Sequence, residues 1–142
     1  MRVLSGIQPT GQMHIGNYLG ATKNWTELQA KHDCLFMVAD LHALTVQQDP
    51  KEFGKATLEK VVGLISAGLD PEKCVIFLQS HVKEHTELSW IFNTITPVAE
   101  LERMTQYKDK SQKHKQNINA GLLTYPILQA ADILLYQAQG VP

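Results

Sequence analysis

Glycine is concentrated near the N-terminus, and one histidine and one asparagine lie among the glycines. The residues in question are Gly6, Gly11, His14, Gly16, Asn17 and Gly20. Glycine allows the backbone to approach a ligand closely, and the free N–H groups and dipole of a helix N-terminus favour phosphate. Gly16 and Asn17 stand where a helix is expected to begin, so a phosphate could bind there beside the donors of His14 and Asn17. Since the spacing is neither a dinucleotide fingerprint nor a P-loop, an ordinary strand–helix turn is the open alternative.

Asp132 is the second chemical candidate, because it is a carboxylate among the apolar residues of an expected helix. Tyr125, Gln129 and Asp132 are spaced i, i+4 and i+7, so they share one helix face. A buried carboxylate is costly unless it has a partner. The pattern alone leaves two interpretations open. Asp132 is either satisfied by backbone groups or a lysine near a helix end, or it offers an acceptor to a ligand.

The elements that must position these residues are indicated by three short apolar segments bounded by turn residues. Residues 3–7, 35–39 and 74–78 are expected to be strands. Helices are expected at about residues 17–31, 51–67, 84–95, 98–107 and 122–137, the last with Pro126 in its first turn. Nearly apolar strands between such helices predict a doubly wound α/β domain, with a parallel sheet covered on both faces. Ligands bind such sheets at the carboxyl ends of the strands, here the loops after Ile7, Ala39 and Gln79.

Composition places the chain among globular proteins and argues against several classes of function. Its 142 residues are 44% apolar and 19% charged, and the net charge of −1 gives no bulk attraction to DNA, RNA or a membrane. No apolar run reaches the ~18 residues of a membrane span and no signal peptide precedes the first strand, which predicts a cytoplasmic protein. Cys34 and Cys74 lie in apolar runs without CxxC spacing, so we expect buried, reduced thiols and no metal held by the protein.

Several segments resemble, in the same order, the motifs of the tryptophanyl-tRNA synthetases, which are class I synthetases. Ser5–Gly11 with His14–Asn17 is similar to the first motif of the family, whose HIGH signature commonly ends in Asn. Residues 39–45, 100–108, 121–126 and 130–136 are similar to its later motifs, so the resemblance spans essentially the whole chain. It implies an incomplete Rossmann-like catalytic domain. Its parts would be a nucleotide-binding half at about 1–80, a helical insertion at about 81–120 and an amino-acid specificity helix at about 121–137.

The resemblance implies a two-step reaction, in which tryptophan attacks the α-phosphate of ATP and is then transferred to its tRNA. Mg²⁺ would accompany ATP, held mostly by phosphate oxygens and water. His14 and Asn17 are the implied catalytic residues beside the phosphates. The implied ATP contacts are Gln8, Pro9, Thr10, Gly16 and Asn17. The KMSKS loop and the helical anticodon-binding domain of the family are not in this sequence, so we expect weak ATP binding and little tRNA charging by these residues alone.

The same resemblance implies an amino-acid pocket around Asp132, whose ionised carboxylate accepts the indole N–H, the single donor of that ring. Phenylalanine would leave the carboxylate unpaired and be rejected. Tyr125 and Gln8 would contact the substrate's ammonium group, and His42 either joins them or is a structural histidine. The full set of implied tryptophan contacts is Leu4, Gln8, His42, Tyr125, Gln129, Asp132 and Val141.

Three positions depart from the family pattern. Gln129 and Leu4 stand where many bacterial relatives have Met and Phe, and both would lie against the indole. Gln129 could instead hydrogen-bond a polar group there. Leu41 replaces a Gln that is common in the motif after the second strand.

Two other functions stay open. The sister enzyme for tyrosine has the same fold and reaction, but it would need a different first motif and acceptors placed for a phenol. A non-catalytic binding or dimerisation module is the other, since the KMSKS loop is absent from the sequence.

The tRNA would be bound mostly by parts outside this sequence, and Lys108–Lys115 is expected to be a solvated loop, with tRNA contact as the alternative. The family is homodimeric, and Trp25 and Trp90 are expected in the core or at a dimer interface.

Overall fold

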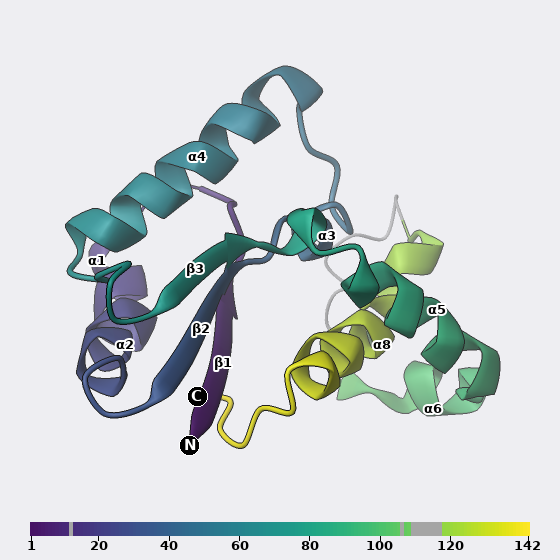
Figure 1. Ribbon diagram of the computed structural model, residues 1–142. Helices are drawn as coiled ribbons and strands as arrows, with labels where there is room; N and C mark the ends of the chain where they lie inside the picture. Colours follow the sequence, from purple (N-terminus) through teal and green to yellow (C-terminus); the bar gives the residue numbers. More distant parts are fainter. Residues whose placement is uncertain (12, 106, 109–117) are drawn as a thin grey trace.

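The sheet of the computed structural model, which describes residues 1–11, 13–105, 107–108 and 118–142, has three parallel strands (Figure 1). They are β1 (Arg2–Ile7), β2 (Asp33–Val38) and β3 (Val75–Leu78), in the order β1-β2-β3. Leu4 is paired with Leu35, and Leu35 with Val75. The three expected strands are therefore confirmed, each end to within two residues. Because the strands are parallel, their carboxyl ends meet at one edge of the sheet.

A run of helical turns connects β1 to β2. It consists of α1 (Ile15–Asn17), a π-helical segment (Tyr18–Thr22) and α2 (Lys23–Leu28). The sequence predicted that this run begins at about residue 17. It begins earlier, at Ile15, because His14 caps it. The His14 ring accepts a hydrogen bond from the Gly16 N–H, and the Asn17 side chain accepts one from the His14 N–H. This reciprocal cap satisfies donors that a first helical turn otherwise leaves free.

The main core lies between one face of the sheet and the helices α2 and α4 (Pro50–Ser66). Asp49 caps α4, and Pro50 occupies its first position, where a helix needs no hydrogen-bonded N–H. The buried cluster is Val3, Trp25, Cys34, Phe36, Val38, Leu64, Leu69 and Cys74. The Trp25 ring stacks on Phe36 with ring centroids 4.8 Å apart, which confirms the core position expected for it. Trp90 is not in the core, because it is 71% exposed.

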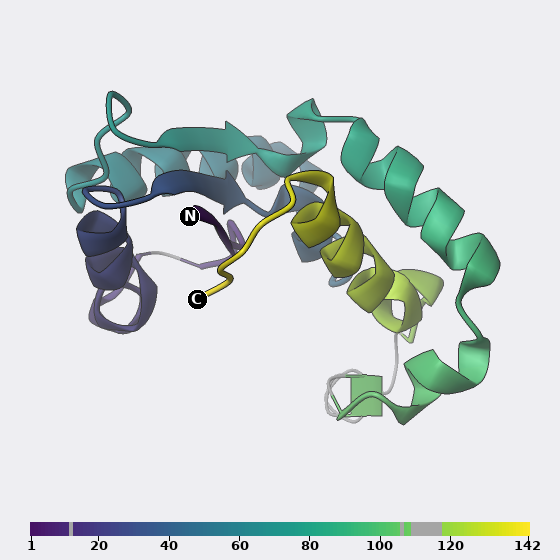
Figure 2. The same cartoon turned by 60° about the horizontal axis from the view of Figure 1, so that its bottom comes forward.

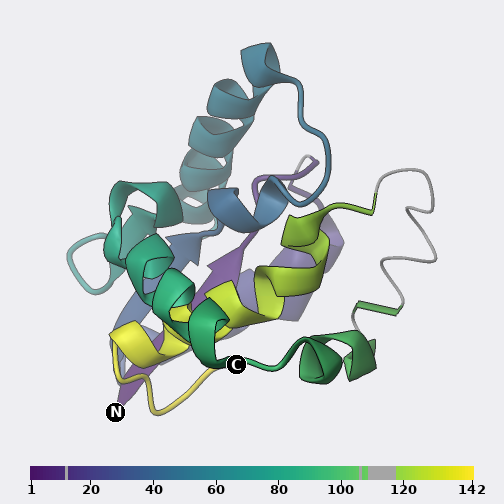
Figure 3. The ribbon, with the colours of Figure 1, turned by 90° about the vertical axis from the view of Figure 1, so that its right-hand side faces the viewer.

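Helices also cover the opposite face of the sheet, near the carboxyl ends of the strands (Figures 2 and 3). α8 (Ala120–Leu135) and the start of α5 (Glu84–Ile95) lie there, and these two helices pack along each other, whereas α6 (Val98–Arg103) packs on α8 away from the sheet. Phe77 shows the sidedness of β3. Ile76 and Leu78 pack on the main core, whereas the Phe77 ring meets His85 of α5 and Tyr136 at the end of α8. Helices on both faces of a parallel sheet confirm the predicted α/β class.

Two helices differ in extent from the expected ones. α8 begins before residue 122, because the Asn119 side chain accepts a hydrogen bond from the Leu122 N–H at 2.9 Å and caps the helix earlier. Pro126 therefore lies inside the helix instead of in its first turn, where it has no N–H to donate to the Leu122 carbonyl. α6 ends before residue 107, because Met104 takes an extended backbone with ψ 131°. Most of the lysine-rich segment, residues 109–117, lies outside the described residues.

After α8 the chain returns to the free edge of β1. The Leu4 N–H donates to the Gly140 carbonyl at 3.0 Å, next to a parallel bridge between the two segments. The Ser5 hydroxyl donates to the Pro142 carbonyl at 3.1 Å. β1 therefore has neighbours on both edges, and Val141 is held beside it.

Two smaller expectations can be compared with the structure. Cys34 and Cys74 are buried free thiols, as predicted. Burial is the main reason why the pKa of each thiol is raised, since it disfavours the thiolate. Across the described ranges, no helix is long and apolar enough to cross a membrane.

Candidate active site

A pocket of ≈ 170 Å³ opens at the carboxyl ends of β1 and β2, against α8. Its wall is formed by Leu4, Ser5, Gly6, Gln8, Met37, Ala39, His42, Tyr125, Gln129, Asp132, Ile133 and Val141. All seven residues that the sequence assigned to amino-acid binding lie on this wall, although they come from separate parts of the chain. Gly6 leaves little room for a side chain beside Met37, because a Cβ there would lie 3.2 Å from the end of the Met37 side chain.

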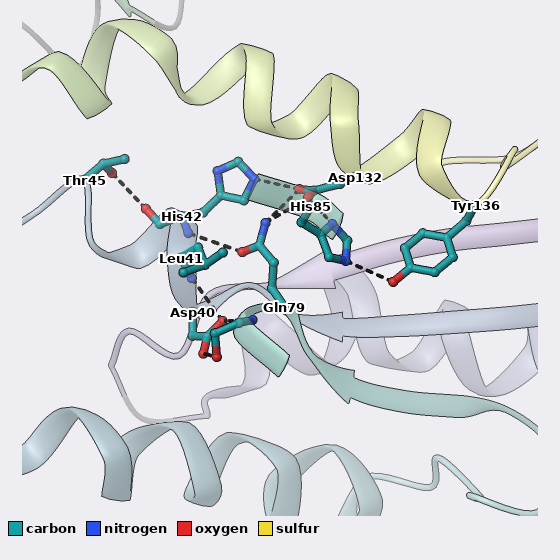
Figure 4. A network of polar contacts seen from close by, with 9 residues as sticks. Asp40, Leu41, His42, Thr45, Gln79, His85, Asp132 and Tyr136 are labelled. Carbon is teal, nitrogen blue, oxygen red and sulfur yellow. Dashed lines mark hydrogen bonds and ion pairs between the residues drawn. The ribbon is translucent and has the colours of Figure 1, made fainter. Parts of the chain in front are cut away.

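Asp132 borders this pocket with only 2% of its surface exposed, and its carboxylate is held by three side chains (Figure 4). Oδ2 lies 2.8 Å from Nε2 of His42, and Oδ1 lies 2.6 Å from Nδ1 of His85. Nε2 of Gln79 donates to both oxygens, at 2.9 Å each. The interpretation with backbone or lysine partners is therefore wrong, since the partners among the described residues are two histidines and a glutamine.

Burial and hydrogen bonding act on this carboxylate in opposite directions. Burial is the largest single influence and raises the pKa of Asp132, because it disfavours the charged form. Hydrogen bonds from His42, His85 and Gln79, with the charge of His42, together outweigh burial and hold the pKa below its ordinary value. Asp132 is therefore ionised at neutral pH. An ionised carboxylate only accepts hydrogen bonds, so the pocket presents an acceptor to its ligand.

Two turns, at the ends of β2 and β3, bring His42 and Gln79 to Asp132. α3 (Asp40–Ala43) follows β2 and carries His42. Gln79 is the first residue after β3, and its Oε1 accepts a hydrogen bond from the His42 N–H at 3.3 Å. Asp40 joins the same turns, because its carboxylate accepts a hydrogen bond from the Ser80 N–H at 2.9 Å. The parallel strands thus place two distant segments side by side beneath α8.

A second hollow, of ≈ 510 Å³, lies between the glycine-rich loop and the start of α4. Gln8, Pro9 and Thr10 line it, so the structure brings these three expected ATP contacts together. Gln8 also lines the first pocket, so the two hollows share part of their wall. α4 holds the loop in place, because the buried Lys60 ammonium donates to the Gly11 carbonyl at 3.1 Å. Burial lowers the pKa of Lys60.

The remaining expected ATP residues, His14, Gly16 and Asn17, lie together at the start of α1. Their mutual hydrogen bonds complete the helix cap. A Cβ on Gly16 would lie 2.9 Å from the His14 ring, so a larger residue would displace that ring. In the described part of the chain, none of these three residues lines either hollow. The structure therefore groups them with one another and apart from the wall that Gln8 and its neighbours form.

Sequence reasoning did not assign a role to three residues of the network around Asp132: Gln79, His85 and Tyr136. Gln79 carried a usable signal, since it stands at the carboxyl end of a parallel strand. His85 carried none, because Asp132 is 47 positions away along the chain and the contact depends on how α5 packs on α8. Tyr136 follows Asp132 by one helical turn, and its contact with His85 at 2.9 Å depends on the same packing.

The family described as tRNA synthetases class I (W and Y) matches residues 1–142. The chain belongs to this family. It is 56% identical over 140 residues to a tryptophan–tRNA ligase from Clostridium tetani, and 57% identical over 143 residues to tryptophan–tRNA ligase 2 from Streptomyces avermitilis. Each alignment covers 99% of this synthetase chain but only 41% or 42% of the relative. The chain thus spans less than half the length of these relatives.

Solved structures agree with the fold of this synthetase chain. The tryptophanyl-tRNA synthetase from Campylobacter jejuni complexed with ADP and tryptophan matches it with a TM-score of 0.94 and 45% identity, over 100% of this chain and 44% of that one. A tyrosyl-tRNA synthetase from Archaeoglobus fulgidus matches with a TM-score of 0.79 and 22% identity, over 99% of this chain and 44% of that one. The second match shows the shared fold alone. The expected class I synthetase fold is confirmed.

Proposed function

We propose that this chain is part of a tryptophan–tRNA ligase, which activates L-tryptophan with ATP and transfers it to tRNA(Trp). The observation that carries the proposal is the ionised Asp132 carboxylate at a pocket whose wall includes Leu4, Met37 and Ile133. The relatives at 56% and 57% identity are named as tryptophan–tRNA ligases. The Campylobacter jejuni relative was solved with ADP and tryptophan, which supports both substrates.

The indole ring suits this acceptor, because it has one N–H donor. A hydrogen bond to a charged group is worth roughly 1.5–3 kcal/mol. A ring without a donor would cover the buried Asp132 carboxylate without donating a hydrogen bond to it, so phenylalanine is disfavoured. Specificity therefore follows from one buried charge in an otherwise largely apolar wall.

The other wall residues receive roles by their place around this acceptor. Tyr125 and Gln8 contact the ammonium group of the substrate, while Leu4, Gln129 and Val141 lie against the indole. They share the pocket wall with Asp132, which supports this division. The His42 ring borders the pocket as well, and we assign it chiefly to holding Asp132, because its Nε2 is bound there.

ATP occupies the hollow beside the glycine-rich loop, lined by Gln8, Pro9 and Thr10. Gly16 and Asn17 serve its phosphates, with His14 and Asn17 stabilising the charge that grows during the reaction. A carboxylate oxygen of tryptophan attacks the α-phosphorus, and pyrophosphate leaves with the electron pair of the broken P–O bond. The shared wall at Gln8 supports a meeting of the two substrates there. Mg²⁺ travels with ATP on its phosphate oxygens and water.

The finer organisation of the protein is proposed as follows. Residues 1–80 form the nucleotide-binding half, 81–120 a helical insertion, and 121–137 the specificity helix. Two copies associate through an exposed apolar face that comprises Trp90, Ile91, Ile95 and Val98. Activation takes place in the cytoplasm, where the buried thiols stay reduced. The tRNA is bound mostly by parts outside this sequence.

Amino-acid-dependent ATP–pyrophosphate exchange tests the proposal. We expect exchange that depends on tryptophan and not on tyrosine, weak with this chain and strong with a version extended at its C-terminus. Exchange supported by tyrosine alone would identify the sister enzyme. No exchange with either amino acid in either version would favour a non-catalytic binding module.

A further inference from the structure

The carboxylate of Asp132 is reached from the pocket, but two of its three partners lie behind it. Gln79 and His85 are completely buried. In the described part of the chain neither lines the pocket, so neither is placed to touch a ligand. Figure 4 shows His85 between Asp132 and Tyr136, with a dashed contact to each. Any influence of His85 or Tyr136 on a ligand must therefore pass through Asp132.

The two contacts of His85 have a defined direction. Its Nδ1 lies 2.6 Å from Oδ1 of Asp132, and its Nε2 lies 2.9 Å from the hydroxyl oxygen of Tyr136. An ionised carboxylate cannot donate, so Nδ1 must carry the hydrogen. A neutral imidazole has one donor and one acceptor nitrogen, so Nε2 then accepts and the Tyr136 hydroxyl donates. With a neutral His85 ring, hydrogen bonds run from Tyr136 to His85 and from His85 to Asp132.

We propose that Tyr136 and His85 are positioning residues that make the pocket selective for a ring with an N–H donor, because their successive hydrogen bonds keep Asp132 an oriented acceptor. This inference rests on the proposed function of the pocket and assigns the origin of its specificity to residues outside the wall. It identifies the selected chemistry as a hydrogen-bond donor on an otherwise apolar ring.

The surroundings of the two rings support this role. Phe77 packs on both, with ring centroids 6.0 Å from His85 and 5.5 Å from Tyr136, so neither ring can turn without disturbing the other. Burial, followed by the charges of Asp132 and Glu84, raises the pKa of Tyr136, so its hydroxyl keeps the hydrogen it donates.

The titratable groups around Asp132 come from two helices and from the turn that follows α8. His42 approaches from α3, His85 from α5, and Tyr136 lies on the turn that follows α8, with Glu84 of α5 beyond it. His42 holds the other oxygen, Oδ2, and therefore limits rotation of the carboxylate.

The hydrogen bonds of Gln79 leave room for a ligand on Asp132. Its single Nε2 lies 2.9 Å from each carboxylate oxygen, so its hydrogen bonding is divided between the two oxygens. An arriving N–H can take over one of these two contacts while Gln79 keeps the other. A carboxylate has about four acceptor positions, which is enough for both histidines, one Gln79 contact and the indole.

Tyr136→Phe is the sharpest perturbation, because it keeps the packed ring and removes only the hydroxyl. Nε2 of His85 then loses its donor and is left as a buried acceptor without a partner. Regaining a donor requires a shift of the His85 ring, which loosens its hydrogen bond to Oδ1 of Asp132. The carboxylate is then less firmly oriented as the acceptor that the pocket offers.

The experiment compares the wild-type chain, Tyr136→Phe and Tyr18→Phe, a matched control at a half-exposed tyrosine outside the network. Equilibrium dialysis gives the dissociation constants of tryptophan and of the analogue in which a benzothiophene sulfur replaces the indole N–H. We expect the wild type and Tyr18→Phe to prefer tryptophan by roughly ten- to hundred-fold. In Tyr136→Phe this preference falls about tenfold, while ATP binding is unchanged. Imidazole ¹⁵N shifts should show hydrogen on Nδ1 of His85 in the wild type and in Tyr136→Phe, because the Asp132 carboxylate is its acceptor in both.

The outcomes separate the inference from the proposed function. A wild-type chain that binds no tryptophan overturns both. A wild type that binds tryptophan selectively, with a Tyr136→Phe variant equally selective, overturns only the role of the two positioning residues. His85 carrying hydrogen on both nitrogens at neutral pH, or on Nε2 alone, would also overturn it. Loss of tryptophan and analogue affinity to the same extent would show that Tyr136 is structural.

Discussion

Replacing Asp132 with asparagine would test whether the buried carboxylate is held as an anion. The amide keeps one oxygen and turns the other into an NH₂ group that faces a histidine N–H. One hydrogen bond to a charged acceptor is lost, at about 1.5–3 kcal/mol, and a buried donor left unsatisfied adds about 1–3 kcal/mol. We expect Asp132→Asn to lower the free energy of unfolding at pH 7 by about 3 kcal/mol. For a domain of this size that corresponds to a fall in Tm of roughly 10 °C.

The pH dependence of this loss follows from the direction of the pKa shift. The folded-state pKa of Asp132 lies below its ordinary value. Its stabilising contribution is therefore fully present above the unfolded-state value of about 4, and it disappears as the pH falls through the folded-state pKa. The difference between the wild type and Asp132→Asn should therefore shrink as the pH falls below about 4.

Urea denaturation followed by circular dichroism measures both effects, with Asp33→Asn as a matched control. Asp33 pairs with Arg2 at 2.8 Å, but its side chain is 57% exposed. An exposed pair of this kind contributes less than about 1 kcal/mol. Equilibrium dialysis should also show weaker tryptophan binding by Asp132→Asn and unchanged ATP binding. Equal losses of stability in the two variants, or a difference that persists undiminished to pH 2, would refute the reasoning, and unchanged tryptophan affinity would refute the indole assignment.

Three further substitutions address the core, a turn and the loop. Leu64→Ala empties a completely buried position and should cost about 2–5 kcal/mol of unfolding free energy in urea titrations; a loss below 1 kcal/mol would contradict the packing described. Gly68→Ala forces an L side chain into φ 108° and sets a Cβ 3.2 Å from Thr26, so Tm should fall by several degrees, and an unchanged Tm would count against this backbone. Lys60→Met keeps the aliphatic stem but removes the donor to the Gly11 carbonyl, so KM for ATP in pyrophosphate exchange should rise roughly fivefold with KM for tryptophan unchanged. A parallel rise in both constants would show a general loss of structure instead.

The strands and the pocket wall could be predicted from the sequence because their signals are local or motif-based. Apolar runs such as Cys34–Val38 indicate buried strands wherever they occur, and the sheet then brings their carboxyl ends together. The spacing of Tyr125, Gln129 and Asp132 placed them on one helix face, and all three line the pocket. The resemblance added Leu4 and Val141, which no periodicity would have connected.

The support for Asp132 could not be predicted in the same way. His42 and His85 approach it from different helices, and their distances to its oxygens depend on how α3 and α5 pack. Helix ends were also difficult to predict, because they depend on single side chains. The Asn119 cap starts α8 early enough to enclose Pro126, and a capping competition of this kind is not visible in a periodic pattern.

The pairing of β1 with the segment around Gly140 has a consequence for how the chain folds during synthesis. Arg2 contacts Gln139, 137 positions later, so β1 gains this neighbour long after its own residues have been made. At typical rates of translation, on the order of ten seconds pass between the synthesis of β1 and that of the segment which pairs with this edge. Contacts of such long range slow folding, because the loop entropy must be overcome before they form. The pocket wall between Leu4 and Val141 is completed only at that step, which makes ligand binding a late reporter of correct assembly.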